Sequence, residues 1–333
     1  MSGAAPGPGG AGGAAGTTEP RRTAAAPPRR HALGYAEVLA AYLLMAGSAP
    51  LVAWIGAPES VVLCLRMALA ALALGVVFLR RPMLADWRRP GAAWRLVAMA
   101  VVSSATLLLF FFAVRQTSVA IAMFLMFLMP LWVTLVAPRV FHTPRDPIVW
   151  PALGLALAGL AVILVPDLLG EGVRVSWIGL LAALATGFGY ASYTLSVKGL
   201  TGRASSATIS MAEAAGDAVI VAPLAIWQLS SSGYQLTGRD WLAVAVMGVL
   251  CTAVAYTLWV EGTRHVRVEH VTVLGYVEPV AGPVFAVLLL GQLPGLWTWV
   301  GGAMILAAGL LVVLFGRGEG AASAAAAAEP GPL

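Results

Sequence analysis

Four ionisable side chains lie well inside long apolar runs of this 333-residue sequence: Arg66, Glu213, Asp217 and Glu278. Removing an ionised side chain from water costs several kcal/mol unless the charge is paired or neutralised. Each of the four therefore requires a functional or a structural explanation, and the chemistry open to them is proton transfer or the binding of a charged ligand.

Glu278 directly precedes Pro279, and Pro283 follows one helical turn later. Proline lacks an N–H and its ring clashes with the preceding turn, so it frees backbone carbonyls inside a helix. We expect helix breaks at Pro279 and Pro283, and another at Pro130 in an earlier run. A carboxyl beside a broken helix is typical of a substrate or ion site. The alternative is a protonated glutamic acid that donates a hydrogen bond in helix packing.

Glu213 and Asp217 are four residues apart, so they share one face of a helix. Two carboxylates this close repel each other, which favours a pair that takes up and releases a proton or holds a cationic group. The alternative is that Glu213 is hydrated near a helix end and Asp217 pairs with a neighbouring helix.

Arg66 can hold a substrate carboxylate through two parallel hydrogen bonds or act as the countercharge to Glu278 or Asp217. Alternatively, it extends its side chain to the nearer edge of the apolar layer. Five aromatic residues are candidates for lining an amphipathic cavity around these groups: Tyr190, Tyr193, Tyr256, Trp259 and Tyr276.

Glu269 and His270 follow Arg264 and Arg267 in a short turn of alternating charge. We interpret this group as a cluster exposed to solvent, and a gate with His270 as a proton relay is the alternative.

The elements that position these residues follow from composition. Hydrophobic residues make up 60% of the chain and charged residues 11%, with a mean hydropathy of +0.87. Soluble domains carry about 25% charged residues. The apolar residues cluster in runs near twenty residues long, without the roughly ten-residue alternation of a membrane β-barrel. The sequence therefore predicts an all-α polytopic membrane protein.

We expect ten transmembrane helices, each near the ~20 residues that cross a bilayer, flanked by disordered tails at 1–34 and 316–333. The expected spans are 35–55, 60–79, 94–114, 117–137, 148–166, 177–196, 206–228, 241–260, 269–290 and 295–315.

Basic residues set the orientation. With the N-terminus in the cytoplasm, sixteen of the twenty Lys and Arg residues fall in inside segments, three in outside loops (Arg115, Arg174 and Arg239), and Arg66 within a span. This bias predicts that both termini are cytoplasmic. Basic loops of this kind explain the pI of 9.6, so we expect no nucleic-acid partner.

An internal repeat divides the chain. Residues 111–136 align on 260–285 without a gap, which places Pro130 over Pro279. The second copy lies five spans after the first. Because five is an odd number, the two copies have opposite orientations in the membrane. The chain is therefore predicted to form two inverted five-helix repeats, at 35–166 and 177–315, an architecture common in secondary transporters.

The second half resembles an EamA domain of the drug/metabolite transporter superfamily in three elements: Ala255-Tyr256, the EPV of 278–280 and the LLLGQ of 288–292. Gly47-Ser48 and Leu65-Arg66 are similar to the family's first and second spans. The resemblance covers about residues 35–315. It implies export or import of small metabolites or drugs, amino acids included.

The leading hypothesis is thus a secondary-active transporter that works by alternating access around a midplane cavity and is driven by a substrate gradient or protons. An intramembrane enzyme or a channel is the alternative. The chain has no Walker A motif. We expect no metal or cofactor, because Cys64 and Cys251 lie inside apolar runs and no histidine is at mid-span. The single lysine, Lys198, among twenty basic residues is typical of a GC-rich bacterium. We therefore expect a bacterial inner-membrane protein, monomeric or homodimeric, whose partners are the lipid bilayer and a small-molecule substrate.

Overall fold

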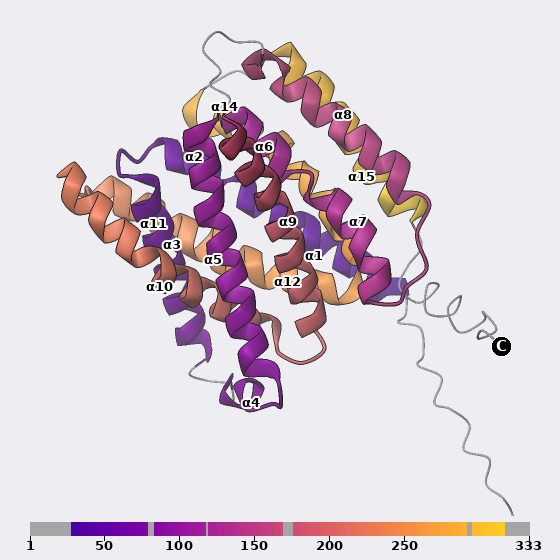
Figure 1. Ribbon diagram of the computed structural model, residues 1–333, viewed down its shortest axis with the longest axis horizontal. Coiled ribbons are helices and arrows are strands. Elements are labelled where there is room, and N and C mark those ends of the chain that lie inside the picture. Colours follow the sequence, from indigo (N-terminus) through magenta and orange to yellow (C-terminus); the bar gives the residue numbers. More distant parts are fainter. Residues whose placement is uncertain (1–27, 79–82, 118, 169–175, 292–294, 317–333) are drawn as a thin grey trace, which may run out of the picture.

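The computed structural model describes residues 28–78, 83–117, 119–168, 176–291 and 295–316, and every regular element in these ranges is a helix (Figure 1). In chain order they are α1 (Pro28–Ala46), α2 (Ser48–Ala53), α3 (Glu59–Phe78), α4 (Met83–Trp87), α5 (Ala92–Gln116), α6 (Val119–Met126), α7 (Met129–Val140), α8 (Val149–Leu168), α9 (Trp177–Leu200), α10 (Ser206–Ser232), α11 (Gly238–Gly248), the π-helix η1 (Val249–Val254), α12 (Ala255–His265), α13 (Val268–Leu274), the 3₁₀-helix η2 (Gly275–Val277), α14 (Glu278–Leu290) and α15 (Leu296–Phe315).

Helix α1 starts earlier than the sequence indicated. It begins at Pro28, so residues 28–34, which we assigned to the N-terminal tail, are helical. Proline is favourable as the first residue of a helix because its missing N–H has no partner there in any case. The other predicted tail residues, 1–27 and 317–333, lie outside the described ranges.

Nine helical segments of the described chain are long and apolar enough to cross a membrane. They overlap nine of the ten predicted spans. The remaining predicted span, the fifth along the chain, corresponds to α8. The apolar part of α8 is a shorter segment, Val149–Leu164. Pro166 and Asp167 follow that segment in the sequence and end its apolar run.

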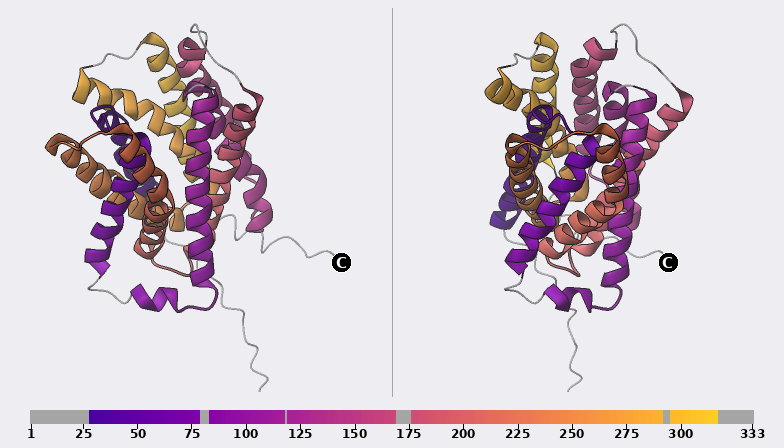
Figure 2. Two further views of the ribbon diagram at one scale, coloured as in Figure 1. Left: turned by 60° about the vertical axis from the view of Figure 1, so that its left-hand side comes forward. Right: turned by 90° about the vertical axis from the view of Figure 1, so that its left-hand side faces the viewer.

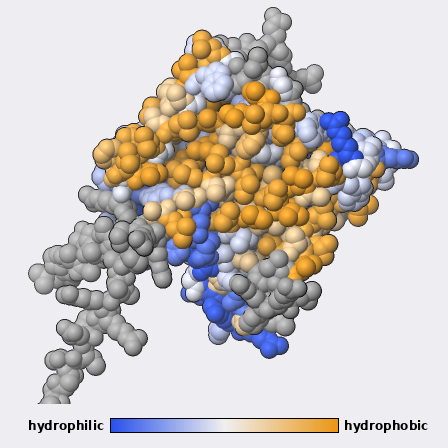
Figure 3. All heavy atoms as spheres, turned by 180° about the vertical axis from the view of Figure 1, so that it is seen from behind, coloured by the Kyte–Doolittle hydropathy of each residue, from blue (hydrophilic) through white to orange (hydrophobic). Residues whose placement is uncertain are grey.

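The outer surface is apolar over a wide area. Leu181, Val219 and Leu288 are each more than 60% exposed. Figure 3 shows one face on which hydrophobic residues form a broad continuous area, with hydrophilic residues gathered near its edges. A contiguous apolar surface of this extent suits contact with lipid.

The helices pair across the two halves of the sequence. The four most extensive pairings are α1 with α12, α3 with α10, α5 with α9, and α8 with α15 (Figure 1 and Figure 2). Each pair joins one helix from before residue 169 to one from after residue 176. The two halves are therefore interleaved.

Two glycines allow the close contact between α8 and α15. A Cβ atom added to Gly301 on α15 would lie 2.3 Å from the carbonyl oxygen of Gly159 on α8, and one added to Gly159 would lie 2.6 Å from the carbonyl oxygen of Gly301. Packing between membrane helices depends on such small residues, because they let two backbones approach.

Gly301→Ala is therefore expected to lower the thermal unfolding temperature of the purified protein in detergent. Forcing a methyl group into this contact separates the helices and costs about 1–3 kcal/mol. Gly154→Ala on α8 is the control, because a Cβ atom there meets no atom within 4 Å. Equal shifts in the two variants would contradict the packing argument.

Candidate functional site

Two spans are interrupted at corresponding prolines. Helix α6 ends at Met126 and α7 begins at Met129, with Pro130 as its second residue. Helix α13 ends at Leu274, η2 follows, and α14 begins at Glu278, with Pro279 as its second residue. Glu278 therefore stands at the first turn of a half-helix.

Tyr276 joins the two interruptions. The Leu131 N–H donates to the carbonyl oxygen of Leu128, which leaves the Phe127 carbonyl without its usual helical donor. The hydroxyl of Tyr276 donates to the Phe127 carbonyl oxygen at 2.5 Å, and the two rings stack 5.7 Å apart. We expected Tyr276 to line the cavity, but its hydroxyl is engaged by this carbonyl. Its role in the structure is to hold the two broken spans together.

Pro283 does not break its helix. Helix α14 continues as an α-helix from Glu278 to Leu290 and passes through Pro283, so our expectation of a third break is corrected. Proline is tolerated inside membrane helices where local adjustments accommodate the carbonyl that loses its donor.

The carboxyl pair on α10 is buried and hydrogen-bonded to neighbouring helices. Asp217 accepts hydrogen bonds from the hydroxyls of Ser103 (3.1 Å) and Ser104 (2.6 Å) on α5. Glu213 accepts one from the hydroxyl of Tyr193 on α9 (2.6 Å), and Ser103 lies 3.5 Å from its other oxygen. Ser103 thus reaches both carboxyls. Because Glu213 is only 3% exposed, the alternative of a hydrated side chain does not hold.

An aromatic pair continues from Glu213 toward α1. The rings of Tyr193 and Trp259 stack 5.9 Å apart and nearly parallel. The indole N–H of Trp259 on α12 then donates to the hydroxyl of Tyr42 on α1, at 2.9 Å. Two hydrogen bonds and this ring stack therefore connect α10 to α1 through α9 and α12.

Arg66 on α3 lies within electrostatic reach of Glu213, Asp217 and Glu278. It also reaches Tyr190 and Tyr256. Its Nε atom is buried and has no hydrogen-bond partner in the described part of the protein. Electrostatic interactions thus connect Arg66 with the three carboxyls. Tyr193 and Trp259 are connected to Glu213 by a hydrogen bond and a ring stack, whereas Tyr276 contacts the Phe127 carbonyl instead.

A search against family models matches residues 32–165 and 177–314 to the EamA-like transporter family. The chain belongs to this family. An uncharacterized transporter of Bacillus subtilis (strain 168), YwfM, is 32% identical over 228 residues, which cover 66% of this chain and 73% of the relative. An uncharacterized transporter of Archaeoglobus fulgidus is 26% identical over 220 residues, with 65% and 75% covered. A crystal structure with 20% identity superposes with a TM-score of 0.71 over 87% of this chain and 98% of its own, which supports the fold.

The EamA-like chain contains three site features that sequence patterns did not indicate. Ser103 and Ser104 are adjacent polar residues in a mostly apolar span, and this pair was the available signal. Tyr42 had no signal beyond its residue type. The π-helix η1 lies against α3, and a Cβ atom on Gly248 would fall 2.8 Å from the Arg66 carbonyl oxygen. π-helical turns are frequent at functional sites.

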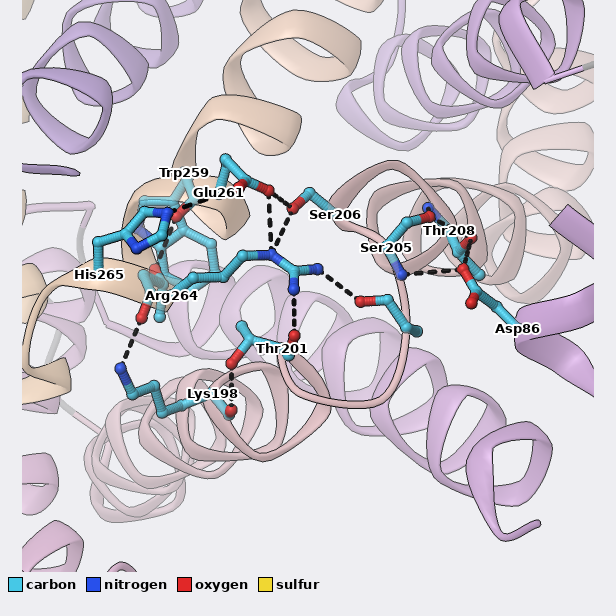
Figure 4. A network of polar contacts seen from close by, with 12 residues as sticks. Asp86, Lys198, Thr201, Ser205, Ser206, Thr208, Trp259, Glu261, Arg264 and His265 are labelled. Atoms are coloured by element: carbon cyan, nitrogen blue, oxygen red, sulfur yellow. Dashed lines mark hydrogen bonds and ion pairs between the residues drawn. The ribbon is translucent and has the colours of Figure 1, made fainter. Parts of the chain in front are cut away.

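Away from these carboxyls, the ends of α9 and α12 are joined to the start of α10 by a polar network (Figure 4). Arg264 forms an ion pair with Glu261 (3.0 Å), and its guanidinium donates to the Ser206 hydroxyl and to the carbonyls of Thr201 and Ala204. We call this end of the molecule, where Lys198, Arg203, Arg264 and Arg267 lie, the basic end.

Asp86 on α4 extends the network to the first half of the chain. It accepts hydrogen bonds from the Ser205 N–H and the Thr208 hydroxyl, both at 2.9 Å, and Arg89 lies 3.6 Å away. Burial alone would raise the pKa of Asp86, but these hydrogen bonds and the Arg89 charge more than offset it, so its pKa lies below the usual range. The anionic side chain also suits the positive N-terminus of α10.

A second network at the basic end corrects our interpretation of Glu269 and His270 as solvent-exposed. Both are buried, at 4% and 0% exposed. His270 Nε2 lies 3.0 Å from a carboxyl oxygen of Asp146, and its Nδ1 lies 2.6 Å from the Tyr35 hydroxyl. Arg267 pairs with Glu269 at 3.1 Å. Residues distant in sequence cover the turn, so its alternating charges do not face water.

Proposed function

We propose that this EamA-like membrane transporter is a secondary-active carrier that moves small metabolites or drugs by alternating access. One observation carries the proposal: Arg66, Glu213, Asp217 and Glu278 come from helices α3, α10 and α14, in both halves of the chain, and gather around one region of the interior. Ionisable groups inside membrane spans usually belong to a substrate or ion pathway.

The proposed topology has ten spans in two inverted five-helix repeats, with both termini in the cytoplasm. It is supported by the distribution of Lys and Arg and by the helix pairings. If the first five spans are exchanged with the last five, span one takes the place of span six and span eight takes the place of span three. The pair α1–α12 (spans one and eight) then becomes the pair α9–α5 (spans six and three). The pairs α3–α10 and α8–α15 each become themselves. This pattern is the one expected of two repeats related by a two-fold axis. The compartment we propose is a bacterial inner membrane, and the protein is a monomer or a homodimer.

The basic end supports alternating access because it is closed by contacts between the two halves. Asp86 joins α4 to α10, and Asp146 joins the segment between α7 and α8 to α13. In this topology the basic end faces the cytoplasm. The networks are thus contacts that must separate when the site opens to that side.

The charges of the site support a substrate that carries an amino group, and amino acids are the leading class. Three carboxyls can hold an ammonium group, and the unpartnered Nε of Arg66 can donate to a carboxylate. Glu213 and Asp217 are close enough that a proton on one favours ionisation of the other, so this pair is the proposed proton site. Glu278 is the second candidate.

The test is counterflow in proteoliposomes. Purified protein is first screened by thermal shift against amino acids, nucleosides, sugars and cationic drugs, because a ligand that binds the folded state raises the unfolding temperature. Vesicles loaded with the unlabelled ligand that gives the largest shift should then accumulate labelled ligand transiently. Arg66→Gln should abolish the accumulation, and Gly154→Ala should not. Equilibration without an overshoot would indicate a channel and overturn the carrier proposal.

A further inference from the structure

An open cavity of about 600 Å³ lies between α3, α5 and α10. Helix α10 starts at Ser206, which contacts Arg264, and ends at Ser232, which lines this cavity. The cavity is therefore at the end of the molecule remote from the Arg264 network. Its volume is in the usual range of about 300–1,000 Å³ for small-molecule sites.

The side chains that line the cavity suit a cation with an apolar body. Glu59 carries the only charge among the described lining residues. Phe111 and Phe112 on α5 and Trp227 on α10 supply aromatic rings on two walls. Aromatic faces attract cations because of their quadrupole, and Trp is the strongest of them. An anion would meet the Glu59 carboxylate and no opposing charge among these residues.

The cavity is in line with the buried carboxyls. On α5, Leu108 and Phe111 lie four and seven residues beyond Ser104, and on α10, Leu224 lies seven residues beyond Asp217. These spacings keep one helix face, and seven residues correspond to roughly 10 Å of rise. Buried Leu63 and Val221 pack in the same apolar cluster as Leu108, between the cavity and the carboxyl site.

We infer that this cavity is a binding site for organic ammonium-type cations with aromatic or aliphatic bodies, held by Glu59 and Trp227, on the pathway to Asp217. Glu59 supplies the countercharge, the rings contact the apolar body, and the apolar layer around Leu108 separates the cavity from the deep site. The pathway rests on the proposed transport function, whereas binding in the cavity does not require transport.

Equilibrium binding of tetraphenylphosphonium to the full-length protein in lipid nanodiscs tests the inference, with empty nanodiscs subtracted. Glu59→Gln and Trp227→Ala should each raise its Kd roughly fivefold. Glu59→Asp, which keeps the charge, should retain most of the affinity. Gly154→Ala, on α8 and away from the cavity lining, should leave the Kd within about twofold, because a Cβ atom there meets no atom within 4 Å. Tetraphenylborate, the anion of the same shape, should not compete.

An unchanged Kd in both Glu59→Gln and Trp227→Ala would overturn the inference, as would weakened binding in Asp217→Asn alone, which would place the cation in the deep site. Competition by tetraphenylborate would also overturn it, since it would show that shape and not charge is recognised. Unfolding temperatures of all variants identify any that do not fold. A failure of counterflow would contradict the carrier proposal and leave these binding results intact.

Discussion

Asp217→Asn is expected to abolish uptake driven by a proton gradient while the protein remains folded. The amide keeps the shape of the side chain and can still accept a hydrogen bond from Ser104, but it cannot bind or release a proton. If substrate and proton binding are linked through this side chain, a coupling of about 1–3 kcal/mol, or 5–150-fold in affinity, disappears. Counterflow, which needs no gradient, should persist.

The measurement compares labelled-substrate uptake into proteoliposomes with and without an imposed pH gradient. Asp240→Asn is the matched control, because it makes the same change at a buried aspartate in the first turn of α11, outside the carboxyl site and outside the networks of the basic end. Glu278→Gln tests the second candidate in the same assay. If both Asp217→Asn and Glu278→Gln respond to the gradient as the unmodified protein does, proton coupling through these carboxyls is contradicted.

The features that the sequence predicted well are those encoded within one span. Apolar runs indicated where the helices lie, and prolines 130 and 279 indicated two interruptions, because both signals are local. The spacing of Glu213 and Asp217 placed them on one face of α10 for the same reason. Pro283 gave a false signal, since a single proline can be accommodated without ending a membrane helix.

The features that the sequence did not predict depend on contacts between segments far apart in the chain. Tyr35 and Asp146 are 235 and 124 residues from His270, so the sequence around Glu269 gave no sign that it would be covered. The Tyr276 hydroxyl meets a carbonyl freed by the break in another span, whereas the Tyr193 hydroxyl meets the carboxyl of Glu213. Packing between distant segments, and not residue type, determines which polar group a tyrosine hydroxyl contacts.

The buried group formed by Tyr35, Asp146 and His270 leads to the second large expected effect. Asp146→Ala should make the basic end accessible to water. It removes a hydrogen-bond partner from a ring nitrogen of fully buried His270, and an unsatisfied buried group costs about 1–3 kcal/mol. Only the closed arrangement loses this stabilisation, because opening separates the partners and hydrates them. Since 1.4 kcal/mol is about tenfold in an equilibrium constant, the open population should rise roughly 5–150-fold.

The rise is measured by the labelling rate of Thr134→Cys with a water-soluble maleimide, in a background carrying Cys64→Ser and Cys251→Ala. Thr134 is 5% exposed, close to Asp146 and Glu269 at the basic end, so its labelling requires opening there. Arg139→Gln is the control, because the guanidinium of that exposed side chain donates to the carbonyl of Leu135 in its own helix. A labelling rate that Asp146→Ala leaves unchanged, in a protein that still unfolds cooperatively, would mean that the His270 network does not hold this end closed. If the ligand found in the thermal-shift screen also changes this labelling rate, the network is linked to the transport cycle. The reason is that a ligand shifts an equilibrium only when it binds the two states differently.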